Sequence, residues 1–490
     1  MSLVSARSEI AFRFRGKAVA LKGYAPDRTL LDWLREEKAA KGTKEGCAEG
    51  DCGACTVVLC HTRGGALSYE PINACILLLG QIDGAELLTV EDLAEGETLH
   101  PVQQAMVDMH GSQCGFCTPG IVMSLFARYH DDAPATRENI NEVLAGNLCR
   151  CTGYRPIVDA ALAVLEEPAK DRFAEQEPAR LAALGDLPGG DLLVGDARSF
   201  FAAPASEETL AELYGAHPDA VLLAGATDVG LWVTKRMQRL RKIIWLGRVA
   251  DFDGCDDDGD VLTLRAGVRL DVAARVLPAL HPDLGVILSR FGSLQVRASG
   301  TVGGSIANGS PIGDLAPALI PFGAEVELRQ GAASRRLPLE DYFLAYGKQD
   351  RRASEYVRAL HAPRLKPHQV YRAYKVSKRF DEDISAVMAA FRFDLDGRRV
   401  VAARVAYGGM AATPKRASGA EAALVGVSLD DAATWGAAIA AIGSDFAPLT
   451  DMRATAAYRS KVAANLLRRA LMEISGVLAP TRLGDLVAAE

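Results

Sequence analysis

The chain has 490 residues, of which 49% are hydrophobic and 24% charged, and its formal net charge is −7. This length exceeds what a single hydrophobic core supports, so we expect a globular protein of three or four domains. The acidic balance argues against a nucleic-acid-binding protein. No apolar run is long enough for a membrane span, and the first residues lack the apolar core of a secretory signal. We therefore expect a soluble, cytoplasmic protein.

The cysteines are concentrated in one part of the sequence. Nine of the ten lie between Cys47 and Cys151, and only Cys255 lies elsewhere. Clustered thiols in a cytoplasmic protein are more typical of metal binding than of disulfide formation, which stays an alternative.

Cys47, Cys52 and Cys55 have the Cys-x4-Cys-x2-Cys spacing of plant-type ferredoxins, which bind a two-iron, two-sulfur (2Fe-2S) cluster. The glycines between them let the backbone fold around such a cluster. A fourth thiolate must come from Cys60 or Cys75. The residues after Cys55 predict a strand that carries Cys60 roughly 16 Å away, at about 3.3 Å per residue. We therefore expect Cys75, which follows the turn-like PIN, to be the ligand and Cys60 to be a buried strand residue.

A second group comprises Cys114, Cys117, Cys149 and Cys151. Thr118–Pro119 predicts the cap and first turn of a helix, whose positive end would face an anionic cluster. The Cys-x-Cys pair predicts two thiols on one side of an extended segment. Paired zinc ligands are usually two to four residues apart, so this spacing disfavours zinc, which remains an alternative.

Five stretches resemble the iron–sulfur half of the xanthine dehydrogenase / molybdenum hydroxylase family: GTKEGCAEGDCGACTV, NACILLL, HPVQQAM, GSQCGFCTPG and GNLCRCTGYRPI. The resemblance implies a ferredoxin-like β-grasp domain over residues 8–92 and an all-α, four-helix-type domain over residues 93–165, each holding one 2Fe-2S cluster. It implies that the eight cysteines chosen above are the ligands. It also implies that Gln113 contacts the pterin of a molybdenum cofactor in a partner subunit.

Residues 166–195 are rich in Ala, Pro, Glu and Gly, and we expect a linker there. A short helix around RFAEQEPARLAAL is an alternative to a plain tether. Farther along, LLAGATDVG and TVGGSIANGSPIGD consist largely of small residues, which let backbone amides approach a pyrophosphate. Turn-rich loops without a ligand are the simpler interpretation. Neither stretch contains GxGxxG or a Walker A motif, so a Rossmann site is not supported.

Three stretches resemble the flavin domain of the same family: LLAGATDVGLWVTK, FGSLQVRASGTVGGSIANGSPIGDLAPAL and YKVSKRFDEDISAV. The resemblance implies a two-lobed α+β domain over residues 196–365 that binds FAD without a Rossmann motif, of the vanillyl-alcohol-oxidase/PCMH type. The implied FAD contacts are Leu222, Leu223, Ala224, Gly225, Ala226, Thr227, Asp228 and Val229 along the diphosphate, Phe291 near the flavin, Thr301, Gly304, Ser305, Asn308 and Asp314 at the pyrophosphate or adenosine, and Val357 and Lys375 near the isoalloxazine. The family usually has asparagine where this chain has Ser305, and serine reaches less far.

Residues 367–480 are expected to form a small α+β domain. The stretch AAFRFDLDGRRVVAARVAYGG alternates around Asp396-Gly397 and predicts a hairpin, and two alanine-rich segments after it predict helices. The resemblance implies the family's C-terminal flavoprotein domain. It also implies that the charged loop Lys378–Asp383 influences the access of the electron acceptor to the flavin; a solvated charged hairpin is the alternative.

The resemblance implies an oxidoreductase, the electron-transfer subunit of a multidomain α+β enzyme. It implies transfer of electrons from a molybdenum centre through two 2Fe-2S clusters to FAD and NAD⁺ as hypoxanthine and xanthine are oxidised to urate. No domain is left to bind molybdopterin, so the substrate chemistry is expected in a separate large subunit, within a heterotetramer of two small and two large subunits. The alternatives are the redox subunit of an enzyme for aldehydes or N-heterocycles, oxygen as the acceptor, and a non-redox, zinc-stapled binding protein.

Overall fold

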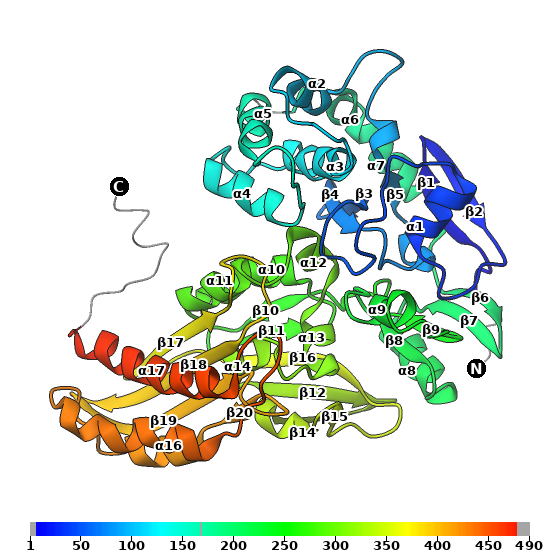
Figure 1. Ribbon diagram of the computed structural model, residues 1–490. Coiled ribbons are helices and arrows are strands. Elements are labelled where there is room, and N and C mark those ends of the chain that lie inside the picture. Colours follow the sequence, from blue (N-terminus) through cyan, green and yellow to red (C-terminus); the bar gives the residue numbers. More distant parts are fainter. Residues whose placement is uncertain (1–5, 167–168, 478–490) are drawn as a thin grey trace. The chain divides into compact units, whose positions relative to one another are not determined.

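The computed structural model describes residues 6–166 and 169–477, which form two compact units (Figure 1). The first unit contains the residues up to Phe252 together with Arg269–Asp271 and Gly292–Thr301. The second contains Asp253–Val268, Val272–Phe291 and the residues from Val302 onward. Residue 480, the expected end of the last domain, lies outside the described residues, as do residues 167–168 of the expected linker.

The N-terminal part of the first unit is a five-stranded sheet with the strand order β2-β1-β5-β3-β4. β1 and β5 pair in parallel, and the other neighbours pair antiparallel. Trp33 packs edge-on against Phe12 and Phe14 of β1, with ring centroids 5.5 Å apart in both pairs, so the helical segment covers the sheet. The elements are β1 (Ile10–Phe14), β2 (Lys17–Leu21), α1 (Leu30–Asp32) with the π-helical continuation Trp33–Glu37, β3 (Thr56–Arg63), β4 (Ala66–Asn73) and β5 (Glu86–Leu88).

Four helices follow the sheet, and they confirm the predicted all-α part. α3 is buried along most of its length and contacts α2, α4 and α5. Its first residue is Thr118, and Cys117 rather than Thr118 occupies the cap position. The side chain of Thr136 accepts a hydrogen bond from the Asn139 amide and so caps α4. The helices are α2 (Pro101–Asp108), α3 (Thr118–Tyr129), α4 (Arg137–Ala145) and α5 (Arg155–Leu165).

Part of the expected linker is helical, so the helical alternative is correct. It forms α6 (Arg172–Glu175) and α7 (Glu177–Gly185). Arg180 on α7 is buried and donates hydrogen bonds to the Glu86 carboxylate (3.0 Å), the Tyr69 hydroxyl (2.6 Å) and the Cys60 sulfur (3.3 Å). These bonds fix α7 to β3, β4 and β5.

The rest of the first unit contains a four-stranded sheet with the order β6-β7-β9-β8. The Ser206 hydroxyl accepts from the Thr209 amide and caps the helix that follows β7. The elements are β6 (Leu192–Asp196), β7 (Ser199–Ala203), α8 (Glu207–Ala216), β8 (Val221–Leu223), α9 (Val229–Thr234), β9 (Lys242–Trp245) and α12 (Leu294–Ser299).

The second unit contains two larger sheets, with the strand orders β10-β11-β16-β12-β13 and β17-β18-β19-β20, and the small pair β14-β15. The predicted helix from the alanine-rich end of the sequence is confirmed as α17, which covers the β17–β20 sheet together with α15. The strands are β10 (Cys255–Asp257), β11 (Val261–Arg265), β12 (Glu325–Gln330), β13 (Ala333–Pro338), β14 (Phe343–Ala345), β15 (Lys348–Gln349), β16 (Tyr356–Pro363), β17 (Gln369–Val376), β18 (Val387–Asp396), β19 (Arg399–Gly408) and β20 (Lys415–Arg416). The helices are α10 (Leu270–Val276), α11 (Pro282–Ser289), α13 (Val302–Asn308), α14 (Leu315–Leu319), α15 (Ser418–Leu424), α16 (Gly436–Asp445) and α17 (Ala456–Ser475).

The structure confirms the predicted hairpin and corrects one predicted loop. β18 and β19 pair antiparallel across the Asp396-Gly397 turn, where Gly397 has a φ of 57°. The small-residue stretch that begins at Thr301 is not turn-rich throughout, because residues 302–308 form α13.

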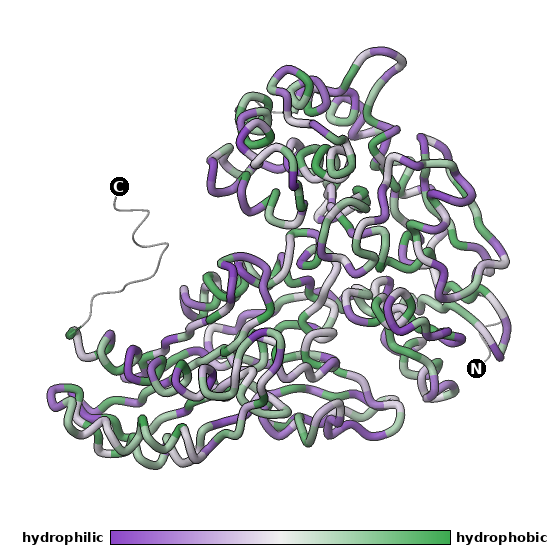
Figure 2. The backbone as a smooth tube through the Cα atoms, in the orientation of Figure 1, coloured by the Kyte–Doolittle hydropathy of each residue, from purple (hydrophilic) through white to green (hydrophobic). Residues whose placement is uncertain are grey.

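None of the helices in residues 6–166 and 169–477 combines the length and apolarity that a membrane span requires. Hydrophobic residues occur in short stretches along the traced chain (Figure 2).

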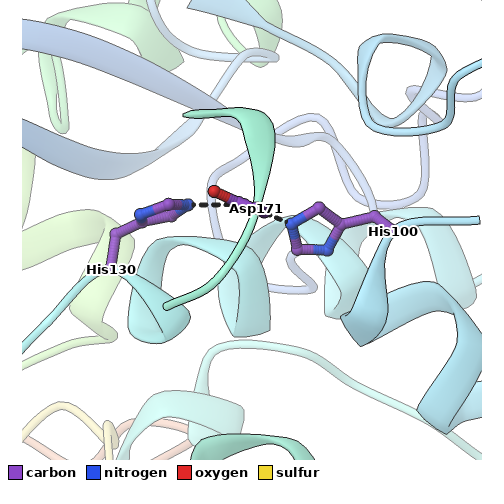
Figure 3. Close-up of side chains that lie close together, drawn as sticks. All are labelled: His100, His130 and Asp171. Atoms are coloured by element: carbon purple, nitrogen blue, oxygen red, sulfur yellow. Dashed lines mark hydrogen bonds and ion pairs between the residues drawn. The ribbon is translucent and has the colours of Figure 1, made fainter. Parts of the chain in front are cut away.

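Asp171, at the start of α6, holds this segment against the helical part. Its carboxylate lies between two imidazoles, 2.6 Å from His100 Nε2 and 3.1 Å from His130 Nε2 (Figure 3). The same carboxylate accepts a hydrogen bond from the Ala174 amide and caps α6. These bonds lower the pKa of Asp171 although burial opposes its ionisation.

Two histidines and a carboxylate could also bind a metal ion. However, Nδ1 of His100 accepts a hydrogen bond from the Val102 amide at 3.2 Å. A neutral imidazole that accepts at Nδ1 carries its proton on Nε2, where the lone pair needed by a metal is absent. We therefore interpret the three residues as a hydrogen-bonded cluster.

We expect Asp171→Ala to destabilise the packing of α6 and α7 by about 2 kcal/mol, because two buried imidazole N–H groups and an amide lose their acceptor. Limited trypsin digestion should cut faster at Arg172 and Arg180 than in the unchanged protein. Asp196→Ala, which removes an exposed carboxylate that also accepts backbone bonds, is the matched control. If Zn²⁺ instead raised the melting temperature of the unchanged protein and not of Asp171→Ala, the metal interpretation would be correct.

Glu70 of β4 is a second buried carboxylate that joins distant parts of the first unit. It pairs with Arg63 (2.6 Å), Arg269 and His61 (3.7 Å). Burial opposes its ionisation, but these three neighbours outweigh that effect and lower the pKa of Glu70 from 4.5 to about 2. The pair with Arg269 fixes residues 269–271 to the N-terminal sheet.

A carboxylate whose pKa is lower in the folded state stabilises the fold above its unfolded pKa, and this contribution is lost as the pH falls towards the folded value. We expect Glu70→Gln to lose about 3 kcal/mol of stability at pH 7. The difference from the unchanged protein should shrink as the pH falls from 4.5 to about 2. Urea unfolding of both proteins across this range measures it, and a difference that does not change with pH would contradict the assignment.

Candidate cofactor sites

Four thiols of the first unit form one connected set. Cys47, Cys52 and Cys55 lie in the loop before β3, and Cys75 follows β4. The Cys47 sulfur lies beside the thiols of Cys52 and Cys75, and these neighbours lower the pKa of Cys47. Cys75 also neighbours Cys55, and the interactions with Cys47 and Cys55 raise the pKa of Cys75. We call these residues the first cysteine set.

Cys60 lies apart from this set. It is fully buried on β3, as predicted, and its sulfur accepts from Arg180 at 3.3 Å. Burial raises the pKa of Cys60 to about 12. Cys255 belongs to the second unit, where it is exposed on β10.

Backbone amides of the loop point at sulfur in the first set. The amides of Glu49 and Cys52 donate to Cys47 Sγ at 3.4 and 3.3 Å. Backbone N–H groups aimed at one sulfur stabilise negative charge on it, as in iron–sulfur sites. Four cysteines with amide donors fit a 2Fe-2S cluster.

The second cysteine set comprises two pairs of neighbouring thiols. Cys114 pairs with Cys151, and Cys117 pairs with Cys149. The chain bends at residues 150–152 instead of continuing as the expected extended segment, and Cys149 is buried while Cys151 is exposed. The Thr152 hydroxyl lies 3.3 Å from Cys149 Sγ. This set also fits a four-thiolate cluster.

The loops of the two sets touch through their backbones. The Leu148 amide donates to the Cys52 carbonyl at 3.0 Å, and the Asn147 side chain donates to the Gly53 carbonyl at 3.1 Å. A Cβ atom on Gly53, whose φ is +67°, would lie 2.0 Å from the Gly146 carbonyl oxygen. Only glycine permits this approach.

A buried polar network, which no sequence pattern indicates, adjoins this contact. Asn147 Oδ1 accepts from the Ser124 hydroxyl (2.7 Å) and from Gln295 Nε2 (3.1 Å). Gln295 lies on α12, and its side chain is 1% exposed. Isolated amides and hydroxyls carry no spacing signal, so only the three-dimensional contacts reveal them.

Part of the second set and several apolar side chains of the same domain are exposed. Cys114, Cys151 and Gln113 are exposed. Several large apolar side chains of residues 99–148 are exposed as well: Leu99, Val107, Met109, Phe116 and Leu148. By contrast, Cys55 and Cys75 of the first set are buried.

The expected diphosphate segment Leu222–Val229 lies in the first unit, between the end of β8 and the start of α9. The Ala224 carbonyl accepts from the Gln81 side chain at 3.0 Å, which attaches the segment to the N-terminal domain. A Cβ atom on Gly225 would lie 1.8 Å from the Ser299 carbonyl oxygen, so only glycine fits beside α12. Thr301 follows α12 and forms a bridge with Arg269.

The other expected FAD contacts lie in the second unit. Gly304, Ser305 and Asn308 are on α13, Val357 is buried on β16, and Phe291 follows α11. Asp314 and Lys375 form a buried ion pair of 2.8 Å. Asp314 also accepts from the Ser385 hydroxyl at 2.5 Å, and Lys375 donates to the Arg290 carbonyl at 2.8 Å. These two charged groups are thus held by protein partners.

Family models match three parts of the chain. A [2Fe-2S] binding domain matches residues 89–162, the FAD binding domain in molybdopterin dehydrogenase matches residues 197–365, and the CO dehydrogenase flavoprotein C-terminal domain matches residues 372–474.

Curated relatives include the xanthine dehydrogenase of Emericella nidulans, which is 31% identical over 89% of this chain and 36% of its own length. The xanthine dehydrogenase/oxidase of Rattus norvegicus is 29% identical over 82% of this chain and 34% of its own length. The chain thus spans about a third of the length of these relatives.

Among solved structures, carbon monoxide dehydrogenase from Hydrogenophaga pseudoflava is similar with a TM-score of 0.52 and 25% identity, over 56% of this chain and 96% of that chain. Quinoline 2-oxidoreductase from Pseudomonas putida 86 has the same fold, with a TM-score of 0.52 and 23% identity over 57% of this chain and 98% of that chain. The three domain matches and the multidomain α+β fold agree with the resemblance in the sequence. The chain is therefore an iron–sulfur and flavin protein of the molybdenum hydroxylase family.

Proposed function

We propose that this chain is the electron-transfer subunit of a xanthine dehydrogenase that uses NAD⁺ as the electron acceptor. The observation that carries the proposal is the pair of four-thiol sets, which share a chain with an FAD binding domain. When bound, 2Fe-2S clusters transfer single electrons, and FAD collects a pair and can hand on a hydride.

Each cysteine set would hold one cluster. The first set, Cys47, Cys52, Cys55 and Cys75, would bind its irons as thiolates, and the amides of Glu49 and Cys52 would stabilise the charge on sulfur. The second set, Cys114, Cys117, Cys149 and Cys151, would do the same at the start of α3.

We propose that the segments described above take part in FAD binding. Small residues of Leu222–Val229 and α13 would let backbone amides approach the diphosphate. The loop Lys378–Asp383 would influence the access of NAD⁺; Arg379 and Asp383 pair within it, with 2.6 Å between Arg379 Nη2 and Asp383 Oδ1.

A separate subunit would supply the molybdenum cofactor. The exposed Cys114, Cys151 and Gln113 support a partner surface there, as do the exposed Phe116 and Leu148, which neighbour the cysteines in the sequence. Gln113 would contact the pterin. We propose a heterotetramer of two small and two large subunits in the cytoplasm.

The substrate assignment rests on the relatives, which are named xanthine dehydrogenases. One observation supports a second candidate. The similar solved chains, which this chain covers almost completely, come from enzymes named for carbon monoxide and quinoline. A redox subunit for a different substrate, such as an N-heterocycle or an aldehyde, is the alternative.

We expect the purified chain to be brown-yellow, with about four irons and one FAD, because each cysteine set would bind one cluster of two irons. It should oxidise NADH with an artificial acceptor and should hydroxylate xanthine only after its molybdenum partner is added. Iron, zinc and flavin analysis with the visible spectrum checks the first part. A colourless protein with zinc would overturn the proposal, and a complex that oxidises quinoline or an aldehyde but not hypoxanthine would support the alternative.

The ligand assignment predicts different outcomes for two buried cysteines. Cys75→Ser should lose the first cluster and retain about two irons, because one thiolate of the set is missing. Cys60→Ser is the matched control, since Cys60 is equally buried but contacts Arg180, and it should retain about four irons. Iron analysis and electron paramagnetic resonance (EPR) of the reduced proteins measure this. Loss of iron from Cys60→Ser alone would show that the fourth ligand is Cys60.

A further inference from the structure

Helix α9 packs on the residues that carry the first cysteine set. Gly230 of α9 lies against the backbone of Ile76, the residue after Cys75, and a Cβ atom on Gly230 would lie 2.4 Å from the Ile76 carbonyl oxygen. The helix begins at Val229, the last residue of the proposed diphosphate segment. One short helix therefore joins that segment to the first set.

The residue that ends α9 places a positive charge beside a proposed ligand. Lys235 Nζ donates a hydrogen bond to the Cys47 carbonyl at 2.5 Å and lies 3.5 Å from a carboxylate oxygen of Glu49. The Glu49 backbone amide in turn donates a hydrogen bond to the Cys47 sulfur. Both charged side chains are partly exposed, at 41% for Lys235 and 43% for Glu49, so solvent weakens their effect without removing it.

We propose that Lys235 is a positioning residue that raises the reduction potential of the cluster held by the first cysteine set. This inference rests on the proposed function. One-electron reduction adds one negative charge to a four-thiolate cluster, and a nearby cation stabilises the reduced form while a carboxylate opposes it. By holding the Cys47 carbonyl, Lys235 also fixes the backbone that directs two amides at Cys47 Sγ.

The higher reduction potential affects which of the two clusters holds a single electron. A higher potential at the first set favours the electron on the cluster whose loop is packed against α9 and the proposed diphosphate segment. Lys235 would therefore bias single electrons towards the flavin side of the relay.

The test is a potentiometric titration of the full chain, loaded with iron and FAD and reduced with dithionite in the presence of mediators, followed by EPR. The signal of the first cluster is the one missing from Cys75→Ser. In Lys235→Gln, the ratio of reduced to oxidised first cluster at a fixed potential should fall about tenfold, which corresponds to about 59 mV for a one-electron couple. The signal of the second cluster should not move, and the shift should shrink at high salt.

Three variants separate charge from folding. Lys235→Arg keeps the cation and should retain most of the potential. Glu49→Gln should shift the ratio in the opposite direction, by about threefold. Lys242→Gln is the matched control, because Lys242 belongs to the same domain but pairs with Asp219 at 2.9 Å, and it should leave both potentials unchanged.

Two failures are distinguishable. In one, Lys235→Gln and Glu49→Gln contain both clusters by iron content and EPR, but neither substitution shifts the potential of the first cluster. This result would overturn the present inference and leave the proposed function intact. An unchanged protein without iron would overturn the proposed function itself.

Discussion

The backbone contact between the two cysteine loops is the constraint on which the first unit depends. The carbonyl of Cys52 is held by the Leu148 amide, and Gly53 lies so close to Gly146 that a side chain would not fit. Two sites that share such a contact cannot shift independently. The proposed electron transfer between them requires this rigidity, because transfer between weakly coupled centres depends on a fixed separation.

The hydrogen bonds of Gln295 beside this contact explain why α12 belongs to the first unit. Gln295 is far along the chain, within the range that matches the FAD binding domain, yet it donates to Asn147, Ser124 and Thr56 inside the core of the cysteine domains. These bonds give the buried Nε2 group of Gln295 its acceptors. Gln295 thus attaches a piece of the flavin domain to the helical and β-grasp domains.

Much of this arrangement could be predicted from local sequence patterns. The rise per residue of a strand was enough to predict that Cys60 lies apart from the other cysteines of the loop. Alternating apolar residues and a turn residue were enough to predict the hairpin at Asp396-Gly397. The packing of α7 could not be predicted in this way. Its anchor is Arg180, a charged side chain buried by contacts with Glu86 and Tyr69, whereas periodicity detects only apolar faces.

The flavin segments show a related limit. Small residues are typical of turns, yet residues 302–308 form a helix because tertiary packing overrides weak local preference. The partnership of Asp314 with Lys375 joins residues 61 positions apart, and no spacing rule connects them. Serine at position 305 is read directly from the sequence, but its place on α13 is not.

The two cysteine sets differ in a way that gives the relay a direction. Cys55 and Cys75 of the first set are buried, whereas Cys114 and Cys151 of the second set are exposed. Electron transfer weakens steeply with distance, so a centre that receives electrons from another subunit must lie near the surface. The exposed second set meets this requirement, and the first set, packed against α9, is suited to pass electrons within the chain. The order partner, second set, first set, flavin is the one that the family resemblance implies, and the exposure of Cys114 and Cys151 agrees with it.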